Sequence, residues 1–276
     1  MKIAVVGGGA LGSLFAGALA RVAEVELIRR GDAPVRADAA AYVLVTVKTY
    51  DTVAALAPFR GVLSPGAAIV SLQNGLIQVR QIEEALGGGR TILLAPTTEG
   101  ATREADGSVR RAGTGSTTVG TPVGNRGTDR ADVFAELLRA AGLAAAVAEP
   151  IEPHLWAKLV VNAAINPVTA LARRPNAHVV DHPPATQRAR ALALEAAAVA
   201  AAAGIELPYP DPSARMLEVA RVTGANRSSM LQDVERGRPT EIDAINGEVV
   251  RLGRRLGVVT PENERVVDEV RRAAGA

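Results

Sequence analysis

The sequence predicts an α/β fold in which a doubly wound parallel sheet is followed by an all-helical domain. Short, continuously apolar runs, typical of buried parallel strands, recur through the first half of the chain. A glycine-rich turn follows the first of these runs. After Glu149 and Pro150 the pattern changes, and almost every later segment has helical periodicity. We therefore expect an α/β domain at residues 1–150 and a helical domain at residues 151–276.

The composition argues against several classes of protein. The chain has 276 residues, of which 48% are hydrophobic and only 3% aromatic, so its core must consist mainly of Ala, Val, Leu and Ile. A net charge of +2, with acids and bases interspersed, argues against a nucleic-acid partner. The absence of cysteine excludes disulfides, thiol nucleophiles and cysteine-ligated zinc. The three histidines are not spaced with carboxylates as metal ligands, so we expect no metal site.

The sequence also bears on where in the cell the protein is located. It starts directly with a strand pattern and shows no signal sequence. The longest apolar run, around residues 196–203, is dominated by alanine and is too short to span a bilayer. We therefore expect a cytoplasmic protein with no membrane partner. The sequence leaves the oligomeric state open, with a homodimer as one option.

The first strand leads into a glycine motif. Residues 3–6 are continuously apolar, and residues 13–22 have the pattern of a helix. Between them lies a G-x-G-x-x-G sequence, made of Gly7, Gly8, Gly9, Ala10, Leu11 and Gly12. In this motif Gly7 permits the tight turn, Gly9 lets a pyrophosphate approach the backbone, and Gly12 allows close helix–strand packing. The start of the helix would offer free N–H groups to the phosphates. The motif therefore predicts a Rossmann-type domain that binds a dinucleotide.

The end of the second strand bears on the choice of cofactor. This strand covers residues 25–28 and is followed by Arg29 and Arg30. An NAD site usually has an acidic residue here for the ribose 2′-hydroxyl, whereas an arginine accommodates a 2′-phosphate. We therefore expect NADPH, with Arg30 as the phosphate ligand. Asp32 is close enough to keep NADH open.

The remaining strands place two more polar residues at the sheet edge where ligands bind. Lys48 follows a strand at residues 42–47, and Asn74 follows another at residues 67–72. The carboxyl ends of parallel strands form the ligand-binding edge of open α/β sheets. A solvated lysine is the other interpretation of Lys48. The further elements expected here are strands at 91–95, 116–120 and 143–148, a hairpin and loop between 113 and 128, and a helix at 130–141.

The second half of the chain is expected to be helical throughout. Asp211 followed by Pro212 has the pattern of an N-cap before a proline at the first helical position. Gly204 is suited to end the preceding alanine-rich helix. The expected helices cover residues 185–203, 211–220, 228–236, a segment from 240 to 256, and a last helix that begins near Pro261.

One helix of this half carries an unusual polar stripe. Lys158, Asn162 and Asn166 are spaced four residues apart within an apolar stretch that contains the only tryptophan. Residues four apart lie on the same face of a helix. A solvated polar face is one interpretation. Asparagine is a poor helix former, however, and arginine and glutamate are abundant in this chain, so the pattern also favours a binding site.

These residues, taken with others, resemble the ketopantoate reductase (2-dehydropantoate 2-reductase) family. The resemblance spans nearly the whole chain, and its last three stretches are far more specific than the glycine motif. The resembling stretches are residues 7–12, 45–48, 73–75, 156–162 with 165–167, 226–233 and 240–247.

The resemblance implies an NADPH-dependent reduction of 2-dehydropantoate to (R)-pantoate, a step toward pantothenate and coenzyme A. It implies that Lys158 is the general acid and that Glu241 orders the site. The remaining implied roles fall into two groups. The implied substrate ligands are Asn74, Lys158, Asn162, Asn166, Asn176, Asn226 and Ser229, and the implied cofactor contacts are Lys48, Asn74, Ala101 and Glu241.

The chain departs from the family in one segment. Only seventeen positions separate Arg30 from Lys48, where the family usually has a longer connection. This difference leaves room for a related reductase that acts on another branched 2-oxo acid. A non-catalytic NADP(H)-sensing protein is a third interpretation of the chain. A sensor would have no use for a proton donor such as Lys158. We expect the active site in the cleft between the two domains.

Overall fold

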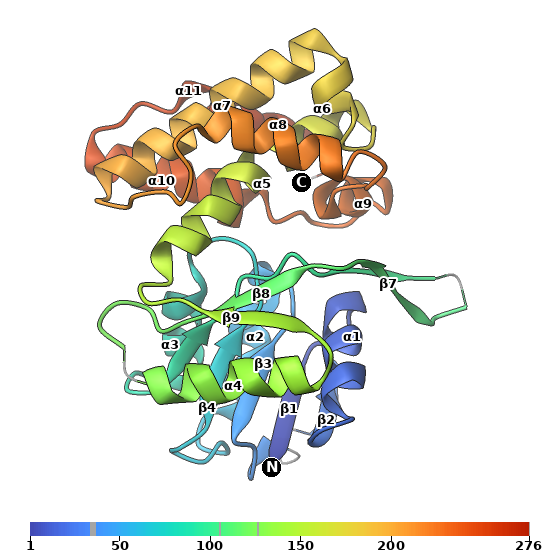
Figure 1. Ribbon diagram of the computed structural model, residues 1–276, viewed down its shortest axis with the longest axis vertical. Coiled ribbons are helices and arrows are strands. Elements are labelled where there is room, and N and C mark those ends of the chain that lie inside the picture. The colour runs from blue at the N-terminus through green and yellow to red at the C-terminus, as the bar shows by residue number, and fades with distance from the viewer. Residues whose placement is uncertain (34–36, 105, 126, 276) are drawn as a thin grey trace. The chain divides into compact units, whose positions relative to one another are not determined.

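The structure is a computed structural model, and it describes residues 1–33, 37–104, 106–125 and 127–275 (Figure 1). The chain forms two compact units. The first consists of residues 1–73 and 77–152, and the second of residues 74–76 and 153–276. The short excursion Asn74–Leu76, which belongs with the second unit, was not expected from the sequence. Part of the shortened segment after Arg30, at residues 34–36, lies outside the described residues.

The first unit is built on a five-stranded parallel sheet, as the sequence predicts. Its strands are in the order β2-β1-β3-β4-β5, so the chain starts in the interior of the sheet and builds outward on both sides. Each strand lies within a residue or two of its predicted position. The strands are β1 (Lys2–Val6), β2 (Glu24–Ile28), β3 (Tyr42–Val45), β4 (Ala68–Ser71) and β5 (Ile92–Leu94).

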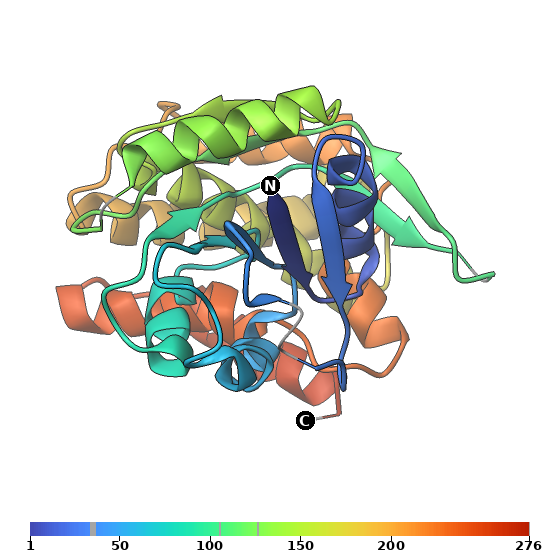
Figure 2. The same ribbon diagram turned by 90° about the horizontal axis from the view of Figure 1, so that it is seen from below.

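Helices cover both faces of this sheet, which confirms the doubly wound prediction. Helices α1 (Ala10–Leu19) and α4 (Thr128–Ala140) pack their apolar side chains on one face, and α2 (Thr52–Leu56) and α3 (Gln78–Leu86) lie on the other (Figures 1 and 2). Two of the few aromatic residues meet in this core. The ring centroids of Tyr42 and Phe134 are 5.2 Å apart.

Two smaller pairs of strands complete the first unit. Strands β8 (Ser116–Val119) and β9 (Ala144–Val147) pair in parallel, at the positions expected. Strands β6 (Gly100–Arg103) and β7 (Val109–Gly113) form a hairpin. The expectation of a hairpin between 113 and 128 was therefore wrong: the hairpin comes earlier. Its strands carry arginine, threonine and glycine rather than apolar runs, so their pattern resembles a loop.

The second unit is helical throughout, as predicted. Its central helix is α5 (Glu152–Ala172), whose residues Trp156, Leu159, Val160 and Ala163 are buried in the core of this unit. The other elements are α6 (His178–Asp181), α7 (Pro183–Ala202), α8 (Pro212–Val222), α9 (Ser229–Glu235), the π-helical turn η4 (Asp243–Gly247), α10 (Glu248–Leu256) and α11 (Pro261–Ala273).

Details of α5 and α8 bear on two expectations from the sequence. Asp211 caps α8 as predicted, because its Oδ1 accepts hydrogen bonds from the backbone N–H groups of Ser213 and Ala214. Helix α5 is a longer apolar stretch than residues 196–203. Within the described residues it alone is long and apolar enough to cross a membrane, but 67% of that stretch is buried inside the protein. We therefore treat α5 as a core helix.

Candidate active site

The glycine motif forms a tight turn between β1 and α1. Gly7 has a φ of +122°, which side chains rarely tolerate, and a Cβ there would lie 2.6 Å from Oγ1 of Thr46. A Cβ on Gly12 would lie 2.0 Å from the carbonyl oxygen of Gly7. The structure thus confirms the turn at Gly7 and the close packing at Gly12.

The same turn offers room for a phosphate group. A Cβ on Gly9 would meet no atom within 4 Å, so the backbone is open there. The first turn of α1 contains no acidic residue that would repel an anion. These features fit the pyrophosphate of a dinucleotide, and the binding itself stays a prediction for residues 7–12.

The two arginines after β2 have different surroundings. The aliphatic stem of Arg29 lies against the glycine turn, because a Cβ on Gly8 would be 2.9 Å from Cγ of Arg29. Arg30 is exposed over 89% of its side chain and forms an ion pair with Asp51 at 3.2 Å. Asp32 accepts a hydrogen bond from the backbone N–H of Arg29 at 2.8 Å. The acid that pairs with Arg30 is therefore Asp51. Because Asp51 is distant from Arg30 in the sequence, the sequence alone did not predict this ion pair.

Lys48 and Ala101, two further predicted cofactor contacts, also belong to the first unit. Lys48 is half-buried and immediately precedes the 3₁₀ turn η2 (Thr49–Asp51). Its carbonyl oxygen accepts a hydrogen bond from the backbone N–H of Asp51 at 2.9 Å. Ala101 lies in β6, at the root of the hairpin. Their roles toward a cofactor remain predictions.

The second unit brings Lys158, Glu241 and Asn74 together. Desolvation lowers the pKa of Lys158 from its ordinary value to about 8, and the nearby carboxylate of Glu241 opposes this effect. Glu241 is only 6% exposed. Its Oε2 accepts a hydrogen bond from Nδ2 of Asn74 at 3.2 Å. A buried acid therefore links the predicted proton donor to a residue more than eighty positions earlier in the chain.

Backbone geometry positions Asn74 and Glu241. Gly75 has a φ of +89°, and a Cβ there would lie 2.4 Å from the carbonyl oxygen of Ala244. Only glycine allows this close approach to the π-helical turn η4. The carbonyl oxygen of Glu241 accepts hydrogen bonds from the N–H groups of Ala244 and Ile245, both at 3.1 Å. Such π-turns are frequent at functional sites.

The predicted substrate ligands Asn166 and Ser229 come from neighbouring elements of the second unit. Asn166 is only 7% exposed on α5, and its carbonyl oxygen accepts a hydrogen bond from Oγ1 of Thr169 at 3.0 Å. Oγ1 of Thr169 is also 2.8 Å from Oγ of Ser228, the N-cap of α9. Ser229 is the first residue of α9. The hydroxyl pair therefore fixes the start of α9 beside the asparagine stripe of α5.

Asn176 and Asn226 are joined by a backbone hydrogen bond. The N–H of Asn176 donates to the carbonyl oxygen of Asn226 at 2.9 Å. Nδ2 of Asn176 donates to Oγ1 of Thr223 at 2.8 Å, but its Oδ1 is buried without a hydrogen-bond partner among the described residues. A buried acceptor without a hydrogen-bond partner is costly, and the substrate contact of Asn176 stays a prediction. Asn162, one turn beyond Lys158 on α5, is half-buried.

A further residue, Asn246, allows α5 to continue past its proline. Pro167 has no N–H, so the carbonyl oxygen of Ala163, four residues earlier, loses its helical partner. Nδ2 of Asn246 donates to this oxygen at 2.9 Å, and also to Oδ1 of Asn263 at 2.9 Å. Asn246 is fully buried. It therefore supports the part of α5 that carries Asn162 and Asn166. Asn246 lies in the stretch 240–247 that resembles the family, but no role was predicted for it.

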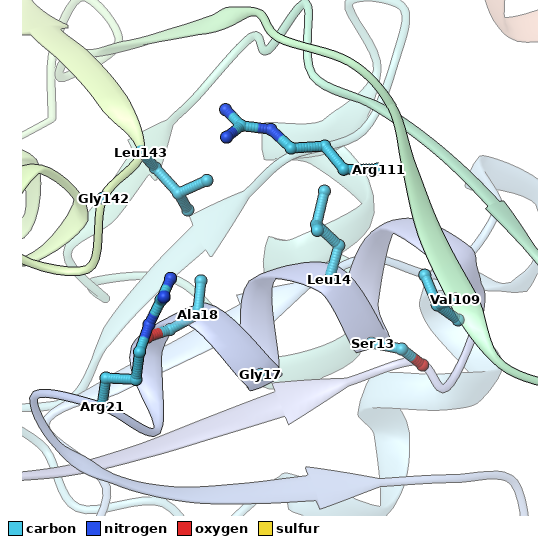
Figure 3. A pocket seen from close by; sticks show the side chains of 9 residues that line it. All are labelled: Ser13, Leu14, Gly17, Ala18, Arg21, Val109, Arg111, Gly142 and Leu143. Carbon is cyan, nitrogen blue, oxygen red and sulfur yellow. The ribbon is translucent and has the colours of Figure 1, made fainter.

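A pocket of about 310 Å³ lies elsewhere in the first unit, along the side of α1 (Figure 3). It is lined by residues of α1, by Arg21 just after this helix, by residues of β7 and by the turn before β9, and none of the predicted site residues is among them. Figure 3 shows Val109 and Arg111 of β7 facing α1 across it. The pocket therefore lies between α1 and the β6–β7 hairpin.

A Rossmann-type sheet with its glycine turn, and a desolvated lysine beside a buried acid, are together typical of NAD(P)-dependent oxidoreductases. The protein belongs to this class. Two family models then identify it more closely. The model of ketopantoate reductase PanE/ApbA matches residues 32–124, and the model of its C-terminal part matches residues 150–274. The chain belongs to the ketopantoate reductase family.

Individual relatives agree with this assignment. The 2-dehydropantoate 2-reductase of Archaeoglobus fulgidus is 37% identical over 98% of this chain and 97% of its own length. That of Pyrobaculum aerophilum is 35% identical over 97% and 96%. A solved PanE/ApbA family ketopantoate reductase from Ralstonia eutropha is 28% identical, with a TM-score of 0.89 over 100% of this chain and 99% of its own.

A second kind of solved structure has the same fold. A D-mandelate dehydrogenase, in a complex with NADH and anilino(oxo)acetate, is 25% identical to this chain. Its TM-score is 0.91 over 100% of this chain and 99% of its own. The shared architecture thus occurs in a D-mandelate dehydrogenase whose structure contains NADH.

Proposed function

We propose that the protein reduces 2-dehydropantoate to (R)-pantoate with NADPH in the cytoplasm, with Lys158 as the general acid. The observation that carries this proposal is the lysine with a pKa of about 8 beside the buried carboxylate of Glu241. The names of the relatives from Archaeoglobus fulgidus and Pyrobaculum aerophilum support the choice of substrate.

The chemistry requires a proton donor at the ketone. A bound nicotinamide cofactor would supply a hydride to the carbonyl carbon, which would leave negative charge on the carbonyl oxygen. The ammonium of Lys158 donates a proton to that oxygen. A positioned general acid contributes about 10²–10⁴-fold to the rate, or roughly 3–5 kcal/mol of the barrier. A pKa of about 8 is well matched to this task at neutral pH, because the lysine is still mostly protonated and yet gives up its proton readily.

Glu241 has two tasks in this proposal. Its carboxylate keeps Lys158 in the charged, proton-donating form, since it opposes the effect of desolvation on the lysine pKa. Through the hydrogen bond at 3.2 Å it also orients Asn74. We assign Asn74, Glu241, Lys48 and Ala101 to contacts with the cofactor.

Neutral amides and a hydroxyl hold the substrate. Asparagine side chains offer both donors and acceptors, so they bind a carboxylate and a hydroxyl without adding a charge that competes with Lys158. Among the residues that the structure describes, Oδ1 of Asn176 has no hydrogen-bond partner, and we assign it to accept a hydrogen bond from a substrate hydroxyl. The residues assigned to the substrate are Asn74, Lys158, Asn162, Asn166, Asn176, Asn226 and Ser229.

The second candidate function is that of an NADH-dependent reductase of another branched 2-oxo acid. Two observations favour this candidate. Asp51 pairs with Arg30 at the position where a 2′-phosphate would need a free arginine. The D-mandelate dehydrogenase of the same fold is complexed with NADH and with an oxoacid derivative.

The experiment that tests the proposal measures oxidation of NADPH and of NADH with a panel of 2-oxo acids. The panel contains 2-dehydropantoate, 2-oxoisovalerate and phenylglyoxylate. We expect the highest kcat/KM for 2-dehydropantoate with NADPH. Turnover of another acid without turnover of 2-dehydropantoate would overturn the substrate assignment. Binding of NADPH with no turnover of any acid would instead favour the NADP(H)-sensing protein.

A further inference from the structure

The β6–β7 hairpin presents one face to α1. In the hairpin, Arg103 pairs with Val109, and Ala101 pairs with Arg111. Side chains alternate between the faces of a β-ribbon, so these four share a face. Figure 3 shows that Val109 and Arg111 face α1. Arg103 therefore belongs to the face of the hairpin that lies over α1.

A partly buried ion pair holds the root of the hairpin. Arg111 binds Glu99 through two hydrogen bonds, one of which joins Nε to Oε2 at 2.7 Å. The side chain of Glu99 is fully buried. Glu99 lies just before β6, so this pair holds the hairpin at its origin. The face that carries Arg103 is therefore held in one orientation where the hairpin begins.

The guanidinium of Arg103 reaches the glycine turn. Its Nη2 donates to the carbonyl oxygen of Gly8, in the turn itself, and lies 3.4 Å from Oγ of Ser13 in α1. Its Nη1 donates to the carbonyl oxygen of Gly107 at 2.8 Å. A cation from a distant part of the chain thus lies directly at the predicted phosphate site.

The partners of Arg103 differ from those of the two neighbouring arginines of the hairpin. Arg110 pairs with Glu104 at 2.7 Å, and Arg111 pairs with Glu99. Within the described residues, the partners of the Arg103 guanidinium are two carbonyl oxygens and a hydroxyl, none of them charged. A positive charge beside the positive end of α1 is unfavourable without an anion. A diphosphate at the turn would satisfy the arginine and the helix together.

We propose that Arg103 is a cofactor-binding residue that contacts the pyrophosphate of the dinucleotide from the β6–β7 hairpin. This inference rests on the proposed function, because it requires that the glycine turn binds a nicotinamide dinucleotide. The pyrophosphate is common to NADPH and NADH, whereas the 2′-phosphate belongs to NADPH alone. Arg103 therefore contributes to the affinity for both cofactors equally, unlike Arg30.

The test is calorimetric binding of NADPH and of NADH to the Arg103→Gln variant at low and at high salt. Loss of the charged contact should weaken both cofactors by the same factor, about tenfold to a hundredfold. The affinity of the variant should also depend less on salt than that of the unchanged protein, because a charge–phosphate attraction is screened by ions. Arg103→Lys keeps the charge and should recover much of the affinity.

Arg110→Gln is the matched control, because Arg110 lies on the same hairpin but pairs with Glu104. It should leave both affinities within about twofold. Unchanged affinity in Arg103→Gln would overturn the inference while leaving the proposed function intact. Weaker binding with an unchanged salt dependence would assign Arg103 a purely structural role at the turn, which also overturns it. If the unchanged protein binds neither dinucleotide, the proposed function itself fails.

Discussion

Each of the two units carries candidate functional residues of its own, and the two units position these residues by different means. In the first unit, backbone geometry forms the predicted phosphate site. Gly7 and Gly12 are needed there because a side chain at either place would overlap the backbone or Thr46. In the second unit, side chains provide the predicted catalytic and substrate-binding groups. Lys158, Asn162 and Asn166 belong to a helix that a buried polar network supports. The glycine turn therefore depends on the absence of side chains, and the helical unit depends on the polar side chains that it carries.

This difference predicts different consequences of mutation. Adding atoms should damage the glycine turn, because there is no space for them. Removing polar atoms should damage the helical unit, because buried donors such as Nδ2 of Asn246 satisfy acceptors elsewhere in it. Exposed ion pairs of the first unit, such as that of Arg30 with Asp51, should matter least for stability, because water can replace either partner.

The largest effect is expected for Gly12→Ala. The added Cβ would lie 2.0 Å from the carbonyl oxygen of Gly7, so β1 and α1 must separate. We expect a loss of about 3–5 kcal/mol in the free energy of unfolding, together with loss of dinucleotide binding. Chemical denaturation and calorimetry measure the two effects.

Gly17→Ala is the control within the same helix. A Cβ at Gly17 meets no atom within 4 Å. Because alanine favours helix over glycine by about 1 kcal/mol, this variant should be slightly more stable and should bind the cofactor normally. Equal destabilisation by the two substitutions would refute the close-packing role of Gly12.

The next effect concerns the support of α5 by Asn246. Asn246→Ala leaves the carbonyl oxygen of Ala163 and Oδ1 of Asn263 without a donor. We expect a cost of about 1–3 kcal/mol in the free energy of unfolding. A double-mutant cycle with Pro167→Ala isolates the cause, because alanine at 167 restores an N–H for Ala163. The cost of Asn246→Ala should then be smaller. An identical cost in both backgrounds would contradict this role.

The smallest effects concern Arg30 and Asp51. Arg30→Ala should weaken NADPH about tenfold and leave NADH nearly unchanged, since only NADPH carries the 2′-phosphate. Asp51→Asn frees Arg30 from an exposed ion pair at 3.2 Å. Exposed pairs contribute less than about 1 kcal/mol, so this variant should bind NADPH only a few times more tightly. Equal loss of both cofactors in Arg30→Ala would exclude the 2′-phosphate role.

The comparison also explains which features the sequence could predict. The glycine motif, the strands and the stripe of Lys158, Asn162 and Asn166 all lie in short, contiguous stretches with a regular period. Periodicity identifies such elements to within a few residues. The parallel sheet and the helical second half were therefore predicted correctly.

The features that the sequence could not predict depend on distant pairs. Asn246 meets Ala163 across 83 positions, and Arg103 meets Gly8 across 95 positions. Contacts of this kind produce no periodic pattern in the local sequence. The pairing of Arg30 with Asp51 was missed for the same reason, and the β6–β7 hairpin was missed because its polar strands lack an apolar period.

The central claim is that Lys158 is the general acid. Its most direct test is the pH dependence of kcat for the wild-type protein and for Lys158→Ala. A general acid must be protonated to act, and the pKa of Lys158 is about 8. Turnover should therefore be highest below this pH and should fall as the pH rises through about 8. Lys158→Ala should lose about 10²–10⁴-fold in kcat and the decline above pH 8, while its NADPH affinity stays nearly intact. An unchanged kcat, or the same decline in the variant, would remove Lys158 from the mechanism.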